Sequence, residues 1–293
     1  MKKMLFIVNP NAGQRRIHRY LSDIVAIFNQ AGYHVEMFVT TAAGDATKVV
    51  AQRAMDQDLI VCAGGDGTFN ETVNGLLRSH YRIPLGYIPC GSTNDFGTSL
   101  KLSTNILQAA RNIVNGTPTK YDVGRFNDRH FTYVASFGAF TRTSYSTPQN
   151  VKNALGHIAY LLEGIQELSQ LRMEHIRLEA DGQTVEGDFL FGAISNSTSV
   201  GGILTLREDQ VDMGDGEFEI LLVRAPKNLA ELSNCIQSVQ NQCYNCAAIT
   251  FFSAKEVRVT ADPKMNWSLD GEKEPGREEI RVVNLHQAIT LIK

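Results

Sequence analysis

Apolar residues in the first 120 positions form two alternating patterns. Short continuous runs such as Leu5–Val8 and Leu59–Ala63 are typical of strands buried on both faces of a sheet. Between these runs, apolar residues recur every three or four positions, which is the spacing of an amphipathic helix. The strands predicted in this way are Leu5–Val8, Val35–Val39, Leu59–Ala63 and Leu85–Ile88, and the helices are residues 17–28, Ala46–Met55, Phe69–Leu77 and Thr104–Val114. Because the connections are short, this alternation predicts an open, doubly wound α/β sheet of parallel strands.

The pattern changes near residue 120, where short β-like runs separated by polar turns become dominant. These runs are Tyr121–Arg125, Phe131–Ser136, Ile176–Ala180, Gln183–Ile194, Glu217–Val223, Ala248–Thr260 and Trp267–Leu269. Two helical stretches interrupt them, at Val151–Leu171 and Leu229–Gln240. We therefore expect an α/β domain over residues 1–120 and a mostly antiparallel β-sandwich or barrel over residues 121–293. The sequence leaves open whether the last strand, about residues 280–293, returns to the first domain.

Composition and charge exclude several classes of protein. The chain of 293 residues is 43% hydrophobic and 20% charged, which fits globular domains with ordinary cores. A formal net charge of −3 gives no broad basic surface for nucleic acid. The 18 uncharged residues Phe189–Leu206 have a polar centre, so they do not predict a membrane span, and the apolar run after Lys3 is too short for a signal peptide. We therefore expect a cytoplasmic protein.

The five cysteines fit the same compartment. They are odd in number and show no secreted-type disulfide framework. Cys243 and Cys246 form a C-x-x-C pair, but a second pair or two suitably spaced histidines would be needed for a structural zinc site. We expect ordinary reduced thiols.

A glycine loop follows the buried strand Leu59–Ala63. In Gly64–Glu71, bare backbone N–H groups at the start of a predicted helix favour binding of an anion. The loop lacks the Lys-Ser/Thr pair of a Walker loop and the third glycine of a dinucleotide fingerprint. Asp66 would repel a phosphate unless a divalent cation lay between them, so the loop indicates a metal-bound nucleotide. The alternative is a tight turn with Asp66 as a helix cap.

Two further loops follow strands of the same predicted sheet. Asn9–Gly13 comes after the first strand, and Pro89–Phe96 comes after the fourth. Ligands of open α/β sheets bind at the carboxyl ends of the strands, so we expect the three loops to converge on one site. Each loop by itself could be a simple turn.

Two acidic clusters lie in the second half of the chain. Asp270 and Glu272 are two residues apart, and on a strand they would point to the same face, which suits a metal ligand beside a proton acceptor. Asp212, Asp215 and Glu217 carry oxygen ligands suited to a hard cation. A solvated acidic turn and an Asp-Gly hairpin are the respective alternatives.

Over nearly its whole length the chain resembles the lipid-kinase family that contains soluble bacterial diacylglycerol kinases and sphingosine kinases. Gly64–Thr68 alone also resembles NAD kinases and, loosely, phosphofructokinases. The continuation Phe69–Glu71, the loop Gly91–Asp95, the terminal Leu269–Glu272 and the stretch Gly156–Tyr160 are more specific to lipid kinases. The resemblance implies an ATP- and Mg²⁺-dependent kinase of phospholipid metabolism that phosphorylates a lipid hydroxyl in a cleft between the two domains, with diacylglycerol or a related glycerolipid as substrate.

The resemblance also implies roles for individual residues. Glu272 is the implied proton acceptor. Asp66 and Asp270, taken from the motifs above, are further candidate catalytic carboxylates. A structural Mg²⁺ is implied at the Asp212 and Asp215 side chains and the Glu217 carbonyl. The implied ATP contacts are Asn9, Pro10, Asn11, Ala12, Gly13, Thr41, Gly65, Asp66, Gly67, Thr68, Phe69, Asn70, Glu71 and Ser92. Asn94 and Asp95, in the same loop as Ser92, are further candidate contacts.

Two positions depart from the family pattern. Ser92 replaces a threonine and keeps the hydroxyl group, whereas Gln14 stands where many relatives have lysine. Either Arg15 or Arg16 could supply that charge, or phosphate could bind less tightly.

The implied substrate lies in a bilayer, so transient peripheral contact with a membrane is expected. The candidate contact residues are Lys101, Phe140, Arg142, Tyr145 and Lys152. Two other functions are kept as alternatives: a kinase of a soluble substrate, similar to NAD kinase, and a non-catalytic regulator that binds a nucleotide or lipid. The sequence leaves the oligomeric state open, with a homodimer among the states it allows.

Overall fold

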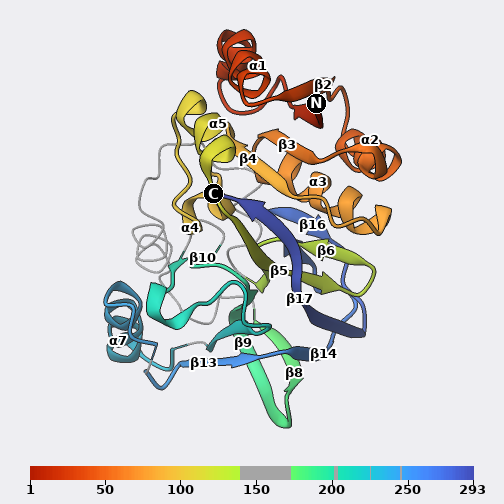
Figure 1. Ribbon diagram of the computed structural model, residues 1–293. Helices are drawn as coiled ribbons and strands as arrows, with labels where there is room; N and C mark the ends of the chain where they lie inside the picture. The colour runs from red at the N-terminus through yellow and green to blue at the C-terminus, as the bar shows by residue number, and fades with distance from the viewer. Residues whose placement is uncertain (139–172, 201–203, 225, 245) are drawn as a thin grey trace. The chain divides into compact units, whose positions relative to one another are not determined.

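The computed structural model describes residues 1–138, 173–200, 204–224, 226–244 and 246–293 (Figure 1). The chain forms two compact units, one made of Met1–Val123 with His286–Lys293 and the other of Gly124–Leu285. The expected helix Val151–Leu171, the stretch Gly156–Tyr160 and the side chains of Phe140, Arg142, Tyr145 and Lys152 lie outside the described residues.

The first unit is built on parallel strands in the order β17-β4-β3-β1-β2. The strands are β1 (Lys2–Val8), β2 (Tyr33–Val39), β3 (Leu59–Gly64), β4 (Leu85–Pro89) and β17 (Glu279–Ile292). β17 joins this sheet through its carboxyl end, where Leu291 lies beside Leu85. The predicted doubly wound α/β arrangement is confirmed.

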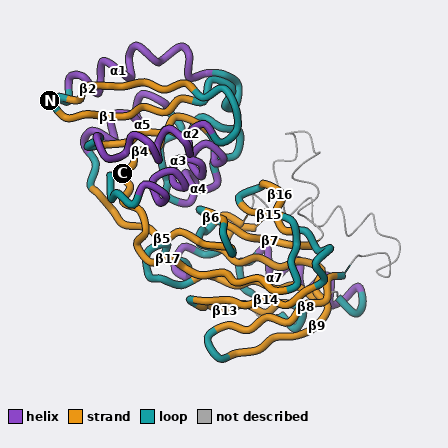
Figure 2. The backbone as a smooth tube through the Cα atoms, turned by 90° about the vertical axis from the view of Figure 1, so that its right-hand side faces the viewer, coloured by secondary structure: helices purple, strands orange, loops and turns teal. Residues whose placement is uncertain are grey.

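Helices connect the strands of this sheet. They are η1 (Arg16–Tyr20), α1 (Leu21–Gln30), α2 (Asp45–Arg53), η2 (Ala54–Asp56), α3 (Asp66–Ser79), α4 (Asp95–Ser99) and α5 (Ile106–Asn115). α1 packs with α5, and Phe28 of α1 and Ile113 of α5 belong to the same buried cluster as Phe6 of β1. α2 packs with α3. Figure 2 shows these purple helices beside the orange strands of the unit.

Two boundaries in this unit differ from the sequence prediction. α3 begins at Asp66, three residues before the predicted Phe69, because the glycine loop itself forms the first helical turn. α4 was not predicted at all, since five residues are too few to show a hydrophobic period.

The second unit is antiparallel, as predicted. Its elements are β5 (Pro118–Phe126, beginning in the first unit), β6 (Arg129–Phe131), β7 (Val134–Gly138), β8 (Glu174–Ala180), β9 (Gln183–Ser195), β10 (Ser199–Val200), β11 (Leu204–Thr205), η5 (Glu208–Gln210), β12 (Phe218–Arg224), α7 (Leu229–Gln240), β13 (Ile249–Ala254), β14 (Glu256–Ala261), β15 (Trp267–Leu269) and β16 (Glu272–Glu274). β9 pairs with β8 through its first half and with β7 and β12 through its second. The strands enclose a core around Trp267, Phe137 and Phe218, as in a β-sandwich.

Two predicted strands are each divided in the structure. The run Ala248–Thr260 breaks at Lys255, because β13 pairs with β12 whereas β14 pairs with β8 and β17. The run Phe131–Ser136 breaks at Thr132 and Tyr133, whose backbone N–H groups bond to a carboxylate instead of to a strand. None of the described helices is long and apolar enough to cross a membrane.

Candidate active site

The three glycine loops of the first unit converge, as the sequence predicted. They follow β1, β3 and β4, and their backbones pack so closely that side chains would not fit between them. A Cβ atom added to Gly91 would lie 2.5 Å from the Cα of Gly65, and one added to Gly13, whose φ is +52°, would collide with the carbonyl oxygen of Cys90. Glycine is therefore required at this junction by contact, not only by turn conformation.

Asp66 links two of these loops. Its Oδ2 accepts a hydrogen bond from the backbone N–H of Asp95 at 3.1 Å, and its Oδ1 accepts one from Phe96 at 3.2 Å. These two N–H groups open α4, so the Asp66 carboxylate caps the neighbouring helix. The predicted cap role is therefore present, at an unexpected helix, and it places a carboxylate at the junction of the loops after β3 and β4.

Amide side chains hold the other loops in place. Asn9 donates from Nδ2 to Thr68 Oγ1 at 2.9 Å, which ties the loop after β1 to α3, and its Oδ1 accepts from the backbone of Asn11. Asn94 accepts from the Gly91 N–H at 2.8 Å and donates back to the Gly91 carbonyl at 2.9 Å. Asn9 and Asn94 therefore hold the loops in shape. Their hydrogen bonds within the protein account for an asparagine at each position without an ATP contact.

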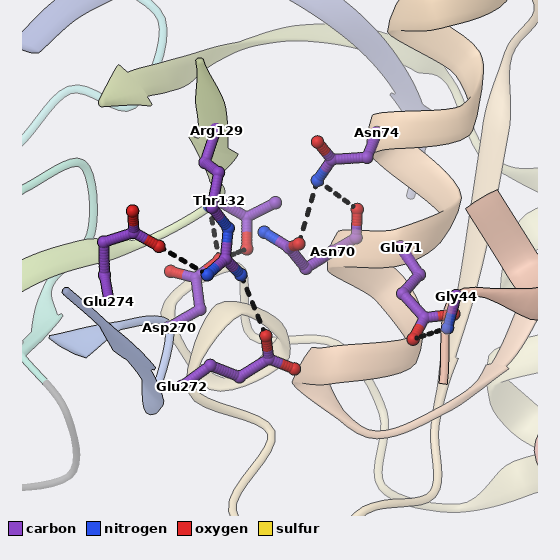
Figure 3. Close-up of polar contacts among 9 residues, drawn as sticks. All are labelled: Gly44, Asn70, Glu71, Asn74, Arg129, Thr132, Asp270, Glu272 and Glu274. Carbon is purple, nitrogen blue, oxygen red and sulfur yellow. Dashed lines mark hydrogen bonds and ion pairs between the residues drawn. The ribbon is translucent and has the colours of Figure 1, made fainter. Parts of the chain in front are cut away.

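Glu71 and Thr41 each form hydrogen bonds with residues at the start of α2. The Glu71 carboxylate accepts a hydrogen bond from the backbone N–H group of Gly44 at 2.7 Å (Figure 3). It accepts another from the backbone N–H group of Ala46 at 3.2 Å. Thr41 donates from its backbone and its hydroxyl to Asp45, each at 2.9 Å, and these bonds lower the pKa of Asp45. Glu71 thus fixes α2 against α3.

Exposed groups surround the junction of the loops. Asn11, Gly13 and Ser92 are all exposed, so these positions are accessible to a ligand. Burial raises the pKa of the Cys90 thiol to about 12, and the positive charge of Arg16 opposes that rise.

The C-terminal motif of the second unit is a tight hairpin, which corrects one sequence prediction. Asp270 and Glu272 do not share a strand: β15 ends at Leu269, which pairs with Glu272 at the start of β16. Asp270 and Gly271 are the two turn residues, with φ of +49° and +84° as in a type I′ turn. The i, i+2 rule fails because it holds only within one continuous strand.

The Asp270 carboxylate is buried and bonded on both oxygens. It accepts from the Thr132 N–H at 2.6 Å, the Thr132 hydroxyl at 2.8 Å, and the Tyr133 and Val134 N–H groups at 3.0 Å each. Burial raises the pKa of Asp270, although these bonds to the charged form oppose the rise. Asp270 therefore fastens the hairpin turn to the segment between β6 and β7.

Glu272 is exposed and is paired with an arginine that the sequence did not single out. Arg129 on β6 donates from Nη2 to Glu272 Oε2 at 3.0 Å and from Nη1 to Glu274 Oε2 at 2.6 Å (Figure 3). Its bonds to the two carboxylates outweigh the effect of burial and raise the pKa of Arg129. Sequence motifs could not reveal the role of Arg129, because it lies 143 positions from Glu272 and no local motif contains both residues.

Asp212, Asp215 and Glu217 lie together before β12. The Asp212 and Asp215 carboxylates accept hydrogen bonds from backbone N–H groups two residues further on, and the Glu217 carbonyl accepts one from Asn284 Nδ2 at 2.9 Å. Within the described part of the chain, no three His, Cys, Asp or Glu side chains are placed to share a metal ion. The expected magnesium ligands are only two side chains, those of Asp212 and Asp215, together with the backbone carbonyl of Glu217, so they are not a group of that kind.

Two buried oxygens beside this cluster lack a hydrogen-bond partner. They are Oε2 of Glu219, a residue only 2% exposed, and Oδ1 of Asn284. Burial, followed by the charges of Asp215, Glu217 and Asp212, raises the pKa of Glu219 to about 8. A concentration of acceptor oxygens without matching donors fits a bound cation.

Comparison with known proteins agrees with this architecture. The family described as the diacylglycerol kinase catalytic domain matches residues 3–126, and the YegS C-terminal NAD kinase beta sandwich-like domain matches residues 134–292. A diacylglycerol kinase of Bacillus subtilis (strain 168) is 35% identical over 295 residues, which cover 100% of this chain and 96% of that protein. One from Staphylococcus haemolyticus (strain JCSC1435) is 35% identical over 91% of this chain and 81% of its own length.

Solved structures give the same result. A crystal structure of a putative diacylglycerol kinase from Bacillus anthracis str. Sterne has a TM-score of 0.81 and 28% identity, covering 99% of this chain and 95% of that one. A second, described as a diacylglycerol kinase from the same strain, has a TM-score of 0.75 and 26% identity, covering 99% and 96%. The chain therefore belongs to the diacylglycerol kinase family, and it is a lipid kinase.

Proposed function

We propose that this protein transfers the γ-phosphoryl group of ATP to the hydroxyl of diacylglycerol or a closely related glycerolipid, with Mg²⁺ as cofactor. The observation that carries the proposal is the packing of Gly13, Gly65 and Gly91 at the carboxyl ends of three parallel strands. Open α/β sheets bind their ligands at such strand ends. The family relationship supplies the reaction class and the relatives' substrate.

The first unit is proposed to bind the nucleotide. Backbone N–H groups of the three loops would hold the phosphates, because amides bared by glycine attract anions, and the start of α3 adds its positive dipole end. Arg16 is the better candidate for the missing family lysine, since its charge acts on Cys90 in the loop after β4. Glu71 and Asn94 would contribute by shaping the site, in keeping with their bonds to α2 and Gly91.

The second unit is proposed to supply the proton acceptor. The lipid oxygen attacks the γ-phosphorus, the bond to the β,γ-bridging oxygen breaks, and ADP leaves with that electron pair. The hydroxyl proton passes to the Glu272 carboxylate, which is exposed and oriented by Arg129. Asp270, held by four hydrogen bonds, fixes the hairpin that carries Glu272. Little covalent chemistry is required of the protein, so positioning dominates.

Mg²⁺ would neutralise phosphate charge during transfer, and Asp66 is the carboxylate proposed to face it. A second, structural ion would be held by Asp212, Asp215 and the Glu217 carbonyl. The unpartnered Glu219 oxygen beside them supports a cation at that place.

A lipid substrate also requires transient contact with a membrane. Lys101, exposed and in a left-handed conformation after α4, is the proposed contact residue within the described part of the chain. The lipid phosphate formed would enter phospholipid metabolism. No observation here favours a soluble substrate or a purely regulatory role.

The test is to incubate the purified protein with γ-labelled ATP, Mg²⁺ and phosphatidylcholine vesicles containing diacylglycerol. A labelled phosphatidic acid is expected. Labelling only of other lipids in a total extract would refute the substrate, labelled NADP from added NAD would favour the soluble-substrate kinase, and ATP binding without turnover would favour the regulator.

A further inference from the structure

Three cysteines lie in the connection between β12 and β13, a segment that contributes no residue to the proposed reaction. Cys235 is on α7, and Cys243 and Cys246 follow that helix. The C-x-x-C spacing suggests that Cys243 and Cys246 act together, but the structure pairs differently: the Sγ atoms of Cys235 and Cys246 are 3.1 Å apart. This distance is that of a close thiol–thiol contact without a covalent bond.

The two thiols differ in access. Cys235 is buried, with 6% of its surface exposed, whereas Cys246 is partly exposed. Cys246 also lines a cavity of about 390 Å³ together with Glu231, Asn234, Ser238 and Cys243. A cavity of this volume is in the range of small-molecule sites.

We infer that Cys235 and Cys246 form a reactive dithiol that exchanges with small disulfides entering this cavity. The carboxylate of Glu231 in the lining favours disulfides that are neutral or positively charged over anionic ones.

The reaction balances as two thiol–disulfide exchanges. The Cys246 thiolate attacks one sulfur of the small disulfide R–S–S–R, forms a Cys246–S–S–R bond and releases one thiolate. Cys235 then loses its proton to water and attacks Cys246 Sγ, forming the Cys235–Cys246 bond and releasing the second thiolate. The protein is oxidised by two electrons and the disulfide is reduced to two thiols.

The order of the two attacks follows from burial. Burial and the neighbouring Cys246 raise the pKa of Cys235 to about 12, so little of it is thiolate at neutral pH. Cys246, which faces the cavity, is the attacking thiol, and Cys235 resolves the mixed disulfide. Cys62 is fully buried and its pKa is likewise raised to about 12. We therefore expect Cys62 not to react, and it serves as an internal control.

The experiment treats the native full-length protein with cystamine, a disulfide with two positive charges, and maps cysteines by peptide mass spectrometry after blocking the remaining thiols. We expect a Cys235–Cys246 cross-link that dithiothreitol reverses. Cys235→Ser should retain a stable adduct on Cys246, and Cys246→Ser should give neither product. The matched control Cys243→Ser should cross-link as the parent does.

A cross-link between Cys243 and Cys246, or a persistent adduct on Cys246 of the parent, would overturn the pairing. The selectivity is tested with glutathione disulfide, which is anionic and should react several-fold more slowly than cystamine. Glu231→Gln should reduce that difference, and an equal or reversed preference in the parent would overturn the assignment of cationic disulfides.

Discussion

Arg129 Nη2 lies 3.0 Å from Glu272 Oε2, and the same guanidinium bonds Glu274 at 2.6 Å. One arginine on β6 therefore sets the orientation of the proposed proton acceptor on β16. Glu274 is the buried partner, with 9% of its side chain exposed, whereas 59% of the Glu272 side chain is exposed. The contact with Glu274 anchors the arginine, and the anchored arginine then orients Glu272.

Replacing Arg129 by Met should lower kcat by about tenfold, on the scale of a positioning effect, with the Kd for ATP unchanged. The free energy of unfolding should fall by about 1–3 kcal/mol, because Glu274 keeps its charge without a partner. Arg129→Lys should restore part of kcat, since an ammonium can contact one carboxylate but not both in this geometry. Steady-state kinetics and urea unfolding measure both quantities.

Arg177, which pairs with Glu179 at 2.8 Å on the surface, is the matched control. Arg177→Met should change stability by less than about 1 kcal/mol and leave kcat unaltered. If Arg129→Met kept the kcat of the parent protein, Arg129 would not be needed to orient Glu272.

Asp270 should act through structure and not on the nucleotide. In Asp270→Asn an amide group must face backbone N–H donors, so we expect the free energy of unfolding to fall by about 2–4 kcal/mol. Turnover of the folded fraction should fall as well, because the hairpin carries Glu272, while the Kd for ATP stays at the parent value. Urea unfolding and equilibrium nucleotide binding test this.

Asp181 offers a close comparison for that variant. Asp181 and Gly182 form another Asp-Gly turn, between β8 and β9, with φ of +46° and +86°. Its carboxylate accepts one bond, from the exposed Lys255 N–H at 2.8 Å. Asp181→Asn should therefore cost about 0.5 kcal/mol or less. If the free energy of unfolding fell equally in Asp270→Asn and Asp181→Asn, the four hydrogen bonds of Asp270 would not stabilise the fold more than the single bond of Asp181.

Asp66→Asn should affect both folding and turnover. The change removes the negative charge proposed to face Mg²⁺, and we expect turnover to fall by at least about a hundredfold. It also brings an amide donor against the N–H groups of Asp95 and Phe96, with a loss of about 1–3 kcal/mol in stability.

A helix-cap variant separates the two effects of the Asp66 substitution. Asn105 caps α5 by accepting from the Gln108 N–H at 3.0 Å, and Asn105→Ala should cost about 1 kcal/mol. Because Asn105 is not part of the three loops, its loss should leave turnover at saturating ATP unchanged. If Asp66→Asn keeps near-parental turnover, Asp66 is only a cap for α4.

The cluster before β12 is tested by Mg²⁺-dependent thermal unfolding. Asp212→Asn combined with Asp215→Asn keeps the side-chain oxygens that accept the turn bonds but removes two charges. In the parent, Mg²⁺ should raise Tm relative to EDTA, because an ion that binds only the folded state stabilises it. The double variant should lose this response.

The double variant should also be at least as stable as the parent in EDTA, since fewer carboxylates then crowd the buried Glu219. Asp262→Asn, which alters a similar turn through its bond from Lys264, should respond to Mg²⁺ as the parent does. An unchanged Mg²⁺ response in the double variant would mean that the cluster is a hairpin without a metal.

The fold could be predicted from the sequence where burial imposes a clear period. Leu59–Ala63 is apolar without interruption because β3 is covered on both faces, and the period of residues 229–240 gave the bounds of α7. The break at Thr132 could not be predicted, since its cause is a carboxylate 138 residues away. The division at Lys255 likewise depends on a change of pairing partners.

In the candidate site, too, local motifs could be predicted from the sequence, whereas contacts between distant segments could not. Glycines at the ends of β1, β3 and β4 indicated one site because parallel strands end at the same edge of a sheet. Motif reading could not reveal that Glu71 binds the start of α2, that Asp66 binds the start of α4, or that Arg129 pairs with Glu272. Each of these contacts joins segments that only the folded chain brings together.

The central claim is tested most directly by kcat and the ATP Kd of Glu272→Gln, measured on diacylglycerol-containing vesicles with γ-labelled ATP and Mg²⁺. The amide keeps the size of the side chain and can still accept the Arg129 bond, but it cannot take up the hydroxyl proton. The account predicts an unchanged ATP Kd and a fall in kcat of about a hundred- to ten-thousandfold, whereas Glu279→Gln on the exposed start of β17 should behave as the parent. A kcat near the parent value at saturating ATP, or a loss of nucleotide binding with most of the rate retained, would contradict it.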